Sequence, residues 1–426
     1  MSRYSRPVSV VGGNRLPFAR AFTAYAEASS QDLLTAALAG LIERFDLAGE
    51  LLGQVACGAV LKHSRDYNLT RECVLGSALD PRTPACDVQQ ACCTGLETTV
   101  LVANKIALGQ IDSGIAGGAD TMSDVPLAFT PRLRAAILAA HRAHTIAGRA
   151  SALARIRPWD LRPDAPPEHE PRTGKTMHQH AAQTALDWGV SRAEQDAFAV
   201  RSHRRLAAAY DRGDLDALLT PFAGLTRDNG LRPDTTVDVL ATLPTIRGTD
   251  PAAGLTAGNA TPLSDGAAVV LLASDEWAAE RGLPVLAHLT DCQTAAVDYV
   301  DGAEGLLMAP VYAVPVLLDR LGLALTDFDR VEVNEAYAAQ VLCTLAAWAD
   351  PTFCTQRLAR AEPLGSVDLD RLNVAGGALA LGHPFAATGG RLVALLAGEL
   401  AAKDLRRGLL TICAAGGLGA AAVLER

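Results

Sequence analysis

The sequence predicts an α/β fold of two related halves, separated by an insertion of loops and helices. Three observations carry this prediction. Short apolar runs alternate with segments of helical periodicity over residues 8–124 and again from about residue 267. A glycine-flanked helix occurs in each half. Between the halves, over about 125–250, the composition changes to an arginine-rich stretch and a proline-broken loop. A chain of 426 residues also exceeds one ordinary domain, so several units are expected.

The first half opens with an apolar strand that we expect to end at Gly12-Gly13, because glycine pairs commonly interrupt strands. Ser30 is the expected cap of the helix that follows. The next strand-like run, at 54–60, precedes a second helix. The last strand of this half is expected to end around Gly117-Gly118. The expected elements are a strand at 8–11, a helix at 32–45, a strand at 54–60, a helix at 94–108 and a strand at 114–119.

The insertion begins with a basic stretch, since six arginines and no acid lie between Pro131 and Pro158. A proline-broken loop follows, and helical patterns resume at 177–188 and 191–212. The second of these opens with a Ser-x-x-Glu capping box at Ser191. The six arginines are residues 132, 134, 142, 149, 155 and 157.

The second half repeats the first in outline. Thr94-Gly95 opens a helix before Gly117-Gly118, and Thr388-Gly389 opens one before Gly416-Gly417. This repeated pattern of a Thr-Gly helix start followed by a glycine pair is weak evidence for two related halves. The expected units are 1–124, a loop domain at 125–250, 251–280 as the end of the first half, and 281–426.

Composition narrows the class of protein. The formal net charge is −9, which argues against general nucleic-acid binding, and 49% hydrophobic residues indicate a globular chain. Nine cysteines without a CxxC pair indicate thiols in a reducing compartment. The apolar runs are too short or too glycine-broken for a signal peptide or a membrane span. We therefore expect a cytoplasmic protein.

Two segments place reactive side chains at turns. Cys92 lies where a strand meets a helix, and the helix dipole there is expected to lower its pKa from about 8.5 toward neutrality. Cys92 is the candidate nucleophile and Cys93 a packing residue, although two small residues in a tight turn would look the same. His383 lies between Gly382 and Pro384, in a bend that suits proton transfer with a thiol.

Two further segments end strands. Cys413 precedes Gly416-Gly417-x-Gly419 and could act as a proton shuttle. Only seven residues follow Gly419, so a dinucleotide-binding unit is excluded. Asn334 could position a water or a carbonyl, while Glu335 beside it could equally be a structural acceptor. No metal site is expected, because neither His141 with His144 nor His178 with His180 has a further ligand at suitable spacing.

Taken in order, these segments resemble the thiolase family over essentially the whole chain. The Cys-x-x-Gly-Leu at Cys92, the Asn-Glu-Ala at Asn334, the Gly-His-Pro at His383 and the Cys413 turn all match the family's motifs. The stretches at 117–123 and 258–267 match as well. The amino-acid sequence around His383 and Cys413 is most similar to that of the thiolase subunit of fatty-acid β-oxidation complexes. Asn334 stands where that subgroup usually has histidine.

The resemblance implies two βαβαβαββ halves in α-β-α-β-α layers. It implies that Cys92 takes the acyl group of a 3-ketoacyl-CoA while His383 accepts its proton. Cys413 then protonates the enolate of acetyl-CoA, which Asn334 and His383 stabilise. The backbone N–H groups of Cys92 and Ala415 form the oxyanion hole.

The resemblance also implies that coenzyme A is a substrate rather than a bound cofactor, and that Thr261 and Met177 contact it. A homodimer or homotetramer is implied, with a β-oxidation partner subunit as a further expectation. Two alternatives remain. One is a biosynthetic enzyme that forms acetoacetyl-CoA, and the other is a non-catalytic acyl-CoA-binding protein, which would need no second thiol.

The basic stretch has three interpretations. Its arginines could be a solvated helix face, could hold the phosphates of CoA, or could contact an anionic membrane or a partner subunit. The phosphate interpretation is slightly preferred because the family binds CoA through its insertion.

Overall fold

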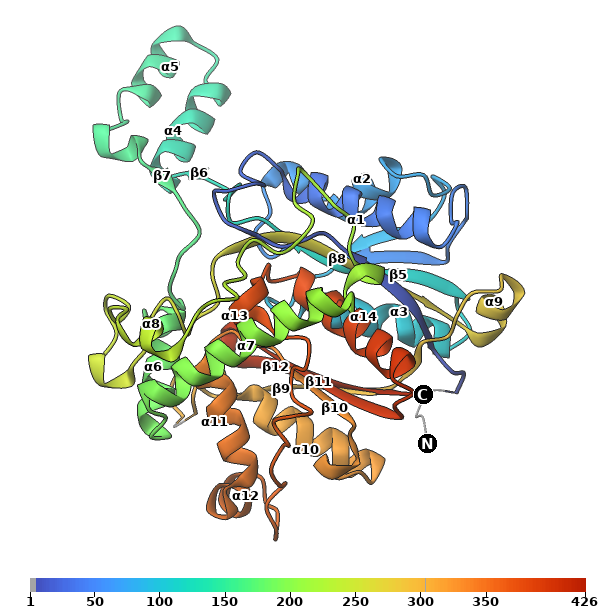
Figure 1. The fold of residues 1–426 in the computed structure, drawn as a ribbon. Coiled ribbons are helices and arrows are strands. Elements are labelled where there is room, and N and C mark those ends of the chain that lie inside the picture. The colour runs from blue at the N-terminus through green and yellow to red at the C-terminus, as the bar shows by residue number, and fades with distance from the viewer. Residues whose placement is uncertain (1–4, 303) are drawn as a thin grey trace.

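The computed structural model describes residues 5–302 and 304–426, which form two halves joined through one continuous sheet (Figure 1). The elements of the first half are β1 (Ser9–Arg15), β2 (Ala19–Arg20), α1 (Ser30–Arg44), β3 (Gln54–Cys57), α2 (Leu69–Leu75), β4 (Ala85–Asp87), α3 (Thr94–Ala107), β5 (Ser113–Asp120), β8 (Ser264–Ala273) and α9 (Asp275–Glu280). Those of the second half are β9 (Ala287–Ala296), α10 (Ala309–Leu321), β10 (Arg330–Val333), α11 (Ala338–Ala349), α12 (Pro351–Arg357), α13 (Ala378–Leu381), α14 (Ala387–Ala402), β11 (Arg407–Ala414) and β12 (Leu418–Glu425).

The two halves have the same strand order. In the first half the order is β4-β3-β5-β8-β1, with parallel pairs up to β5 and antiparallel pairs beyond it. In the second half β10 pairs parallel with β11, and β12 and β9 follow in antiparallel pairs. Leu372 forms a parallel bridge to Val331, where the first half has β4. Ser9 and Val10 of β1 pair with β9 and join the two halves.

Helices cover both half-sheets and also fill the space between them. α3 and α14 pack against each other and against strands of the first half, and α14 also contacts β11 (Figure 1). α1 covers the outer face of the first half-sheet, and α10 that of the second. The expected α-β-α-β-α layering of two βαβαβαββ halves is therefore confirmed.

The central helices touch at two glycines. A Cβ on Gly389 would lie 2.0 Å from the Leu96 nitrogen, and one on Gly95 would lie 2.5 Å from the Ala386 oxygen. Backbones approach this closely only where no side chain intervenes. Because Cys92 lies just before α3 and His383 just before α14, this contact brings their two turns together.

Two of the expected element ends are wrong. β1 does not stop at Gly12-Gly13 but continues to Arg15, because Phe45 and Ala394 pack where Cβ atoms of these glycines would lie. By contrast, the strand expected at 114–119 agrees with β5, in which Gly117-Gly118 lie. The cap of α1 is Ser29 rather than Ser30, with Asp32 completing a capping box.

The insertion has two parts. α4 (Pro131–Arg142) and α5 (Ile146–Leu153) form a hairpin that projects from the body, above the short strands β6 (Ala128–Phe129) and β7 (Pro163–Asp164) (Figure 1). The second part lies on the body, where α6 and α7 pack against α11. Its helices are α6 (Met177–Asp187), α7 (Arg192–Arg212) and α8 (Val237–Ala241). The Ser191 capping box of α7 is formed as expected.

Two expectations about composition can be compared with the structure. All nine cysteines are free thiols. Among residues 5–302 and 304–426, no helix has both the length and the apolar character that crossing a membrane requires.

Candidate active site

Cys92 lies at the N-terminus of α3, in a turn that the backbone bends sharply. Ala91 before it has φ of 45°, a left-handed conformation that non-glycine residues rarely adopt. Cys92 is partly exposed, whereas Cys93 is fully buried with its Sγ 3.5 Å from the Ile412 oxygen. The structure therefore agrees with Cys93 as a packing residue and presents Cys92 at the turn.

The expected lowering of the Cys92 pKa is wrong for the free protein. Removal of the thiol from water raises its pKa to about 12. The backbone N–H groups of Ala415 and of Cys92 itself interact with the sulfur and lower the pKa, but less than burial raises it. Cys92 is therefore a neutral thiol at pH 7, and its proton has to leave as the sulfur reacts.

His383 is held by hydrogen bonds from its backbone and from its ring. Its backbone N–H donates to the Ser264 hydroxyl at 3.2 Å, and its Nδ1 lies 2.6 Å from the Thr388 hydroxyl. That hydroxyl also reaches the Pro384 oxygen at 3.3 Å. If the hydroxyl donates to the carbonyl, it accepts from Nδ1–H, so Nε2 carries the free lone pair. Nε2 is then the nitrogen that can act as a base.

Asn334 faces that base. Its Nδ2 lies 3.4 Å from the His383 Nε2, while its buried Oδ1 has no hydrogen-bond partner within the described residues. Glu335 beside it accepts from Ser202, Asn373 and the Leu379 N–H. Of the two open interpretations, the structural one fits Glu335, and Asn334 is left with an unused acceptor at the site.

Cys413 completes the cluster of reactive groups. It ends β11, is buried, and lies close enough to Cys92 that a charge on either sulfur would raise the pKa of the other. Burial raises the pKa of the Cys413 thiol further. Asp120 accepts from the Ala386 N–H at 2.7 Å and so anchors the loop that carries His383. The structure thus brings Cys92 and Cys413 together from two separate turns and pairs His383 with Asn334.

A family model of the thiolase N-terminal domain matches residues 8–276, and one of the C-terminal domain matches residues 283–426. The chain belongs to the thiolase family. It is 37% identical to the 3-ketoacyl-CoA thiolases of Yersinia pestis (strain Pestoides F) and Yersinia pseudotuberculosis (serotype O:1b), over 100% of this chain and 98% of each relative.

Solved thiolase structures share the fold over their full lengths. The crystal structure of human mitochondrial 3-ketoacyl-CoA thiolase matches with a TM-score of 0.80 and 26% identity, over 99% of both chains. Its complex with CoA matches with the same score and identity, over 99% of this chain and 98% of that one. The Bacillus anthracis acetyl-CoA acetyltransferase matches with a TM-score of 0.82 and 26% identity, over 100% of both.

Sequence reasoning missed the carboxylate that fixes the Ala415 turn of this thiolase. Glu170, from the insertion, accepts from the Gly416 N–H at 3.0 Å and from the Tyr299 hydroxyl at 3.0 Å. Gly416 has φ of 77°, so the turn needs glycine there and a fixed partner. Glu170 thereby helps to aim the Ala415 N–H at Cys92. Its place in an irregular loop left no periodic signal.

Met177 and Thr261, the two expected substrate contacts, differ in whether the side chain is already hydrogen-bonded within the protein. Met177 begins α6 and is partly buried against the hydrophobic cluster that contains Tyr337 and Cys413. The Thr261 hydroxyl donates to the Ala378 oxygen at 2.8 Å, so its side chain is already engaged. The Tyr337 hydroxyl lies 2.9 Å from the His178 Nδ1, which places a polar pair next to Met177.

The four histidines weighed as metal ligands are His141, His144, His178 and His180. Among the described residues, no group of three or more His, Cys, Asp or Glu side chains is arranged to hold a metal ion. His178 is next to the Tyr337 hydroxyl, and the His180 Nε2 lies 2.8 Å from the Thr173 hydroxyl. These imidazoles therefore serve local hydrogen bonding in this thiolase.

The pH dependence of acylation should reveal the environment of His383. Burial, with the positive charge of Arg391, lowers the pKa of His383 to about 3. The base is therefore neutral and competent at every pH above that value, and kcat/KM for acylation should not fall between pH 7 and pH 5. Rapid-quench measurement across this range checks the prediction, and an acid limb near pH 6.5 would contradict it. The same shift makes folding stability decline as pH drops below about 6.5 toward 3, since the unfolded chain then binds the proton first.

Proposed function

We propose that this thiolase cleaves 3-ketoacyl-CoA to acetyl-CoA and a shortened acyl-CoA, with Cys92, His383 and Cys413 as catalytic residues. Two interacting buried thiols, Cys92 and Cys413, are the single observation that carries the assignment, and the neutral imidazole of His383 is the proposed base. A protein that only binds acyl-CoA has no use for the second thiol. The full-length likeness to 3-ketoacyl-CoA thiolases supports the substrate class.

In the first half-reaction the Cys92 sulfur attacks the 3-keto carbon, and its proton passes to the His383 Nε2. The bond between carbons 2 and 3 then breaks, and the electron pair leaves with the acetyl-CoA enolate. Cys413 protonates carbon 2 of that enolate and becomes a thiolate. Because the pKa of the Cys92 thiol is about 12, proton transfer and attack are coupled rather than preceded by a stable thiolate.

In the second half-reaction CoA attacks the thioester on Cys92. The thiol proton of CoA passes to the Cys413 thiolate, and the protonated His383 returns its proton to the leaving Cys92 sulfur. All three side chains thereby regain their starting forms, and no external acid or base is consumed. The scheme uses each residue once as acid and once as base.

Two sets of donors would stabilise the negative oxygens. The N–H groups of Cys92 and Ala415 already interact with the Cys92 sulfur, so a thioester oxygen there lies near both. Each such donor contributes roughly 3 kcal/mol to the transition state. For the enolate oxygen, a water held by Asn334 and the His383 ring is the proposed partner, consistent with the unused Asn334 Oδ1.

The protonation state of Cys413 suits its proposed role as the acid in cleavage. A buried thiol with a raised pKa is protonated at neutral pH, which is the form that donates to the enolate. In condensation the same residue becomes a thiolate when it gives its proton to the departing CoA, and it then acts as the base. We assign CoA and acyl-CoA as substrates, a homodimer or homotetramer as the working state, and the cytoplasm as the compartment that suits nine free thiols.

Cleavage rates across chain lengths test the function directly. We expect CoA-dependent cleavage of 3-ketoacyl-CoA substrates beyond four carbons, measured from four to sixteen carbons by loss of the 3-ketoacyl-CoA absorbance. Activity confined to acetoacetyl-CoA would identify the biosynthetic alternative. No cleavage at any length, with tight acyl-CoA binding, would leave the non-catalytic alternative.

The α4–α5 hairpin supports a contact outside the chain. Its arginines lie on an element that projects from the body (Figure 1). Large apolar side chains around this element are exposed. Ile146 is 87% exposed and Trp159 56%. Exposed apolar side chains next to cations suit a partner subunit or an anionic membrane surface better than the phosphates of CoA. The other exposed apolar residues are Leu127, Phe129, Ile137, Leu138, Leu153 and Leu161.

Substituting Arg142, Arg149 and Arg155 with glutamine should leave the KM for CoA within about twofold of the wild type. Binding to the partner subunit, or to vesicles containing anionic lipid, should fall by severalfold, because each cation near such a surface contributes around 1 kcal/mol. Steady-state kinetics and vesicle flotation measure the two effects. A raised KM for CoA would instead place these arginines at the substrate phosphates, and no change in any of these would leave a solvated helix.

A further inference from the structure

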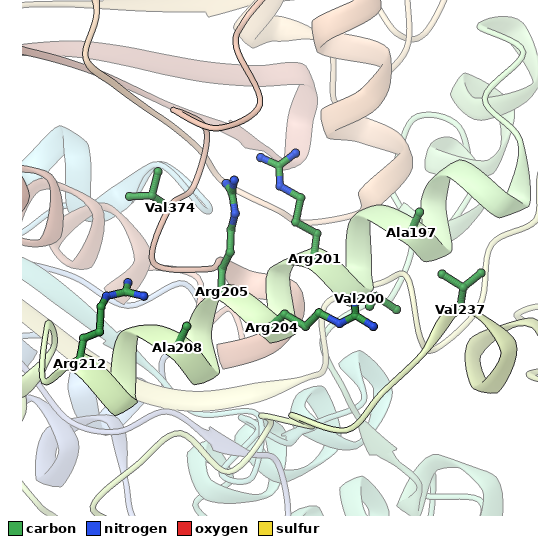
Figure 2. A pocket seen from close by; sticks show the side chains of 9 residues that line it. All are labelled: Ala197, Val200, Arg201, Arg204, Arg205, Ala208, Arg212, Val237 and Val374. Atoms are coloured by element: carbon green, nitrogen blue, oxygen red, sulfur yellow. The ribbon is translucent and has the colours of Figure 1, made fainter.

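A second basic feature lies on the body, along the outer face of α7. A cavity of about 440 Å³ is lined there by four arginines and an apolar remainder (Figure 2). Its volume is within the range of small-molecule sites. The lining residues are Ala197, Val200, Arg201, Arg204, Arg205, Ala208, Arg212, Val237 and Val374.

These side chains share one face of the helix. Arg201, Arg205 and Ala208 are spaced by four and three residues, so they lie in line along α7. Ser202 and Leu206, a quarter-turn or more away, are buried against the body instead. Ser202 donates to Glu335. The arginines of the cavity and the buried residues Ser202 and Leu206 therefore lie on different faces of α7.

The arginines of this face are incompletely neutralised. Arg201 donates to the backbone oxygens of Leu369 and Leu372 rather than to a carboxylate. Arg205 also donates to Leu372 and reaches Asp370, an acid that is 95% exposed, at 3.3 Å. Within the described part of the chain, no aspartate or glutamate lines the cavity.

The two inner guanidinium groups also repel each other. Both are half-buried, and the pKa of each is lowered, first by burial and, for Arg201, next by the charge of Arg205. Figure 2 shows both side chains extending from α7 toward the side of Val374. The repulsion between these two positive groups is unfavourable, and a bound anion would remove it. The protein as a whole is acidic, with a net charge of −9, so this cluster of positive charge is local.

We propose that this face of α7 is a binding site for a phosphate-bearing ligand, separate from the site of acyl transfer. Guanidinium groups bind phosphate oxygens through their N–H groups, and Arg201 with Arg205 would use those N–H groups that do not donate to Leu369, Leu372 or Asp370. The apolar side chains of Val200, Val237 and Val374 offer a surface for the body of an organic phosphate. A nucleoside phosphate fits this combination, and a free phosphate would use the arginines alone.

Isothermal titration calorimetry with ADP and with pyrophosphate tests the proposal. The enzyme is first saturated with desulfo-CoA, a CoA that lacks its thiol, so that the nucleotide part of the substrate site is filled. We expect saturable binding of both probes, and R201Q/R205Q should weaken it at least about tenfold. ADP binding more tightly than pyrophosphate assigns the source as an organic phosphate, and equal affinities assign a free one.

Three variants separate the site from general charge effects. R201K/R205K keeps the charge but loses the forks and should also weaken binding. R204Q changes an exposed side chain and should weaken binding even if the double variants fold poorly. R65Q/R82Q removes two exposed arginines outside α7 and should bind as the wild type does. Wild-type affinity in both R201Q/R205Q and R204Q, equal weakening in R65Q/R82Q, or no binding after desulfo-CoA saturation would overturn the proposal. Cleavage activity is recorded in parallel, so its loss is distinguished from loss of this site.

Discussion

Replacing Cys92 with alanine should abolish thiolase turnover, with a loss of about 10⁴-fold or more in kcat, because no other side chain can carry the acyl group. The turn at Ala91 presents only this sulfur to the N–H groups of Cys92 and Ala415. Intact-mass measurement after incubation with acyl-CoA should show a thioester on the wild type and none on Cys92→Ala.

Cys93→Ala is the matched control, since it removes the adjacent thiol. Its Sγ is buried against the Ile412 oxygen, so this variant should lose some thermal stability but keep the thioester. Acylation of Cys93 in the Cys92→Ala protein, or loss of the thioester in Cys93→Ala alone, would transfer the nucleophile role to Cys93.

Replacing Cys413 with alanine should suppress exchange of the acetyl-CoA α-protons with solvent by about 10²–10⁴-fold, the range that a positioned acid or base contributes. Acylation of Cys92 should persist, because Cys413 acts on carbon 2 and not on the thioester. Exchange into deuterium oxide, followed by mass spectrometry or NMR, measures the effect.

His383→Ala supplies the comparison for this second prediction. His383 accepts the Cys92 proton and also faces the enolate, so its loss should slow both acylation and exchange. A Cys413→Ala protein that exchanges protons at the wild-type rate would show that the base is another group. If both variants slowed both steps equally, the proposed division of proton transfer between them would be wrong.

The sequence was sufficient for the layered fold and for the turns that carry the site. Each of these rests on a local signal, such as the helical periodicity of 94–108 or the glycine and proline around His383. Local signals also explain the two wrong element ends. A glycine pair is a local signal for a strand end. At Gly12 and Gly13, however, the missing side chains leave room for Phe45 and Ala394, which are distant in sequence.

The electrostatics of the site could not be predicted in the same way. The turn at Cys92 suggested a lowered pKa from the helix dipole, whereas burial, which depends on the whole fold, raises it. The role of Glu170 depends on a hydrogen bond to Gly416, 246 residues further along the chain. The tautomer of His383 likewise follows from Thr388 and Pro384 only once their positions are known.

The contact between Gly95 and Gly389 has a consequence for how such an enzyme can change. The proposed nucleophile and base belong to different halves, and their separation is set by two backbones in direct contact. A small shift of either helix would alter the spacing of the reacting groups, and no nearby loop could absorb it. New substrates must therefore be accommodated by the insertion, whose helices can diverge while this seam stays fixed.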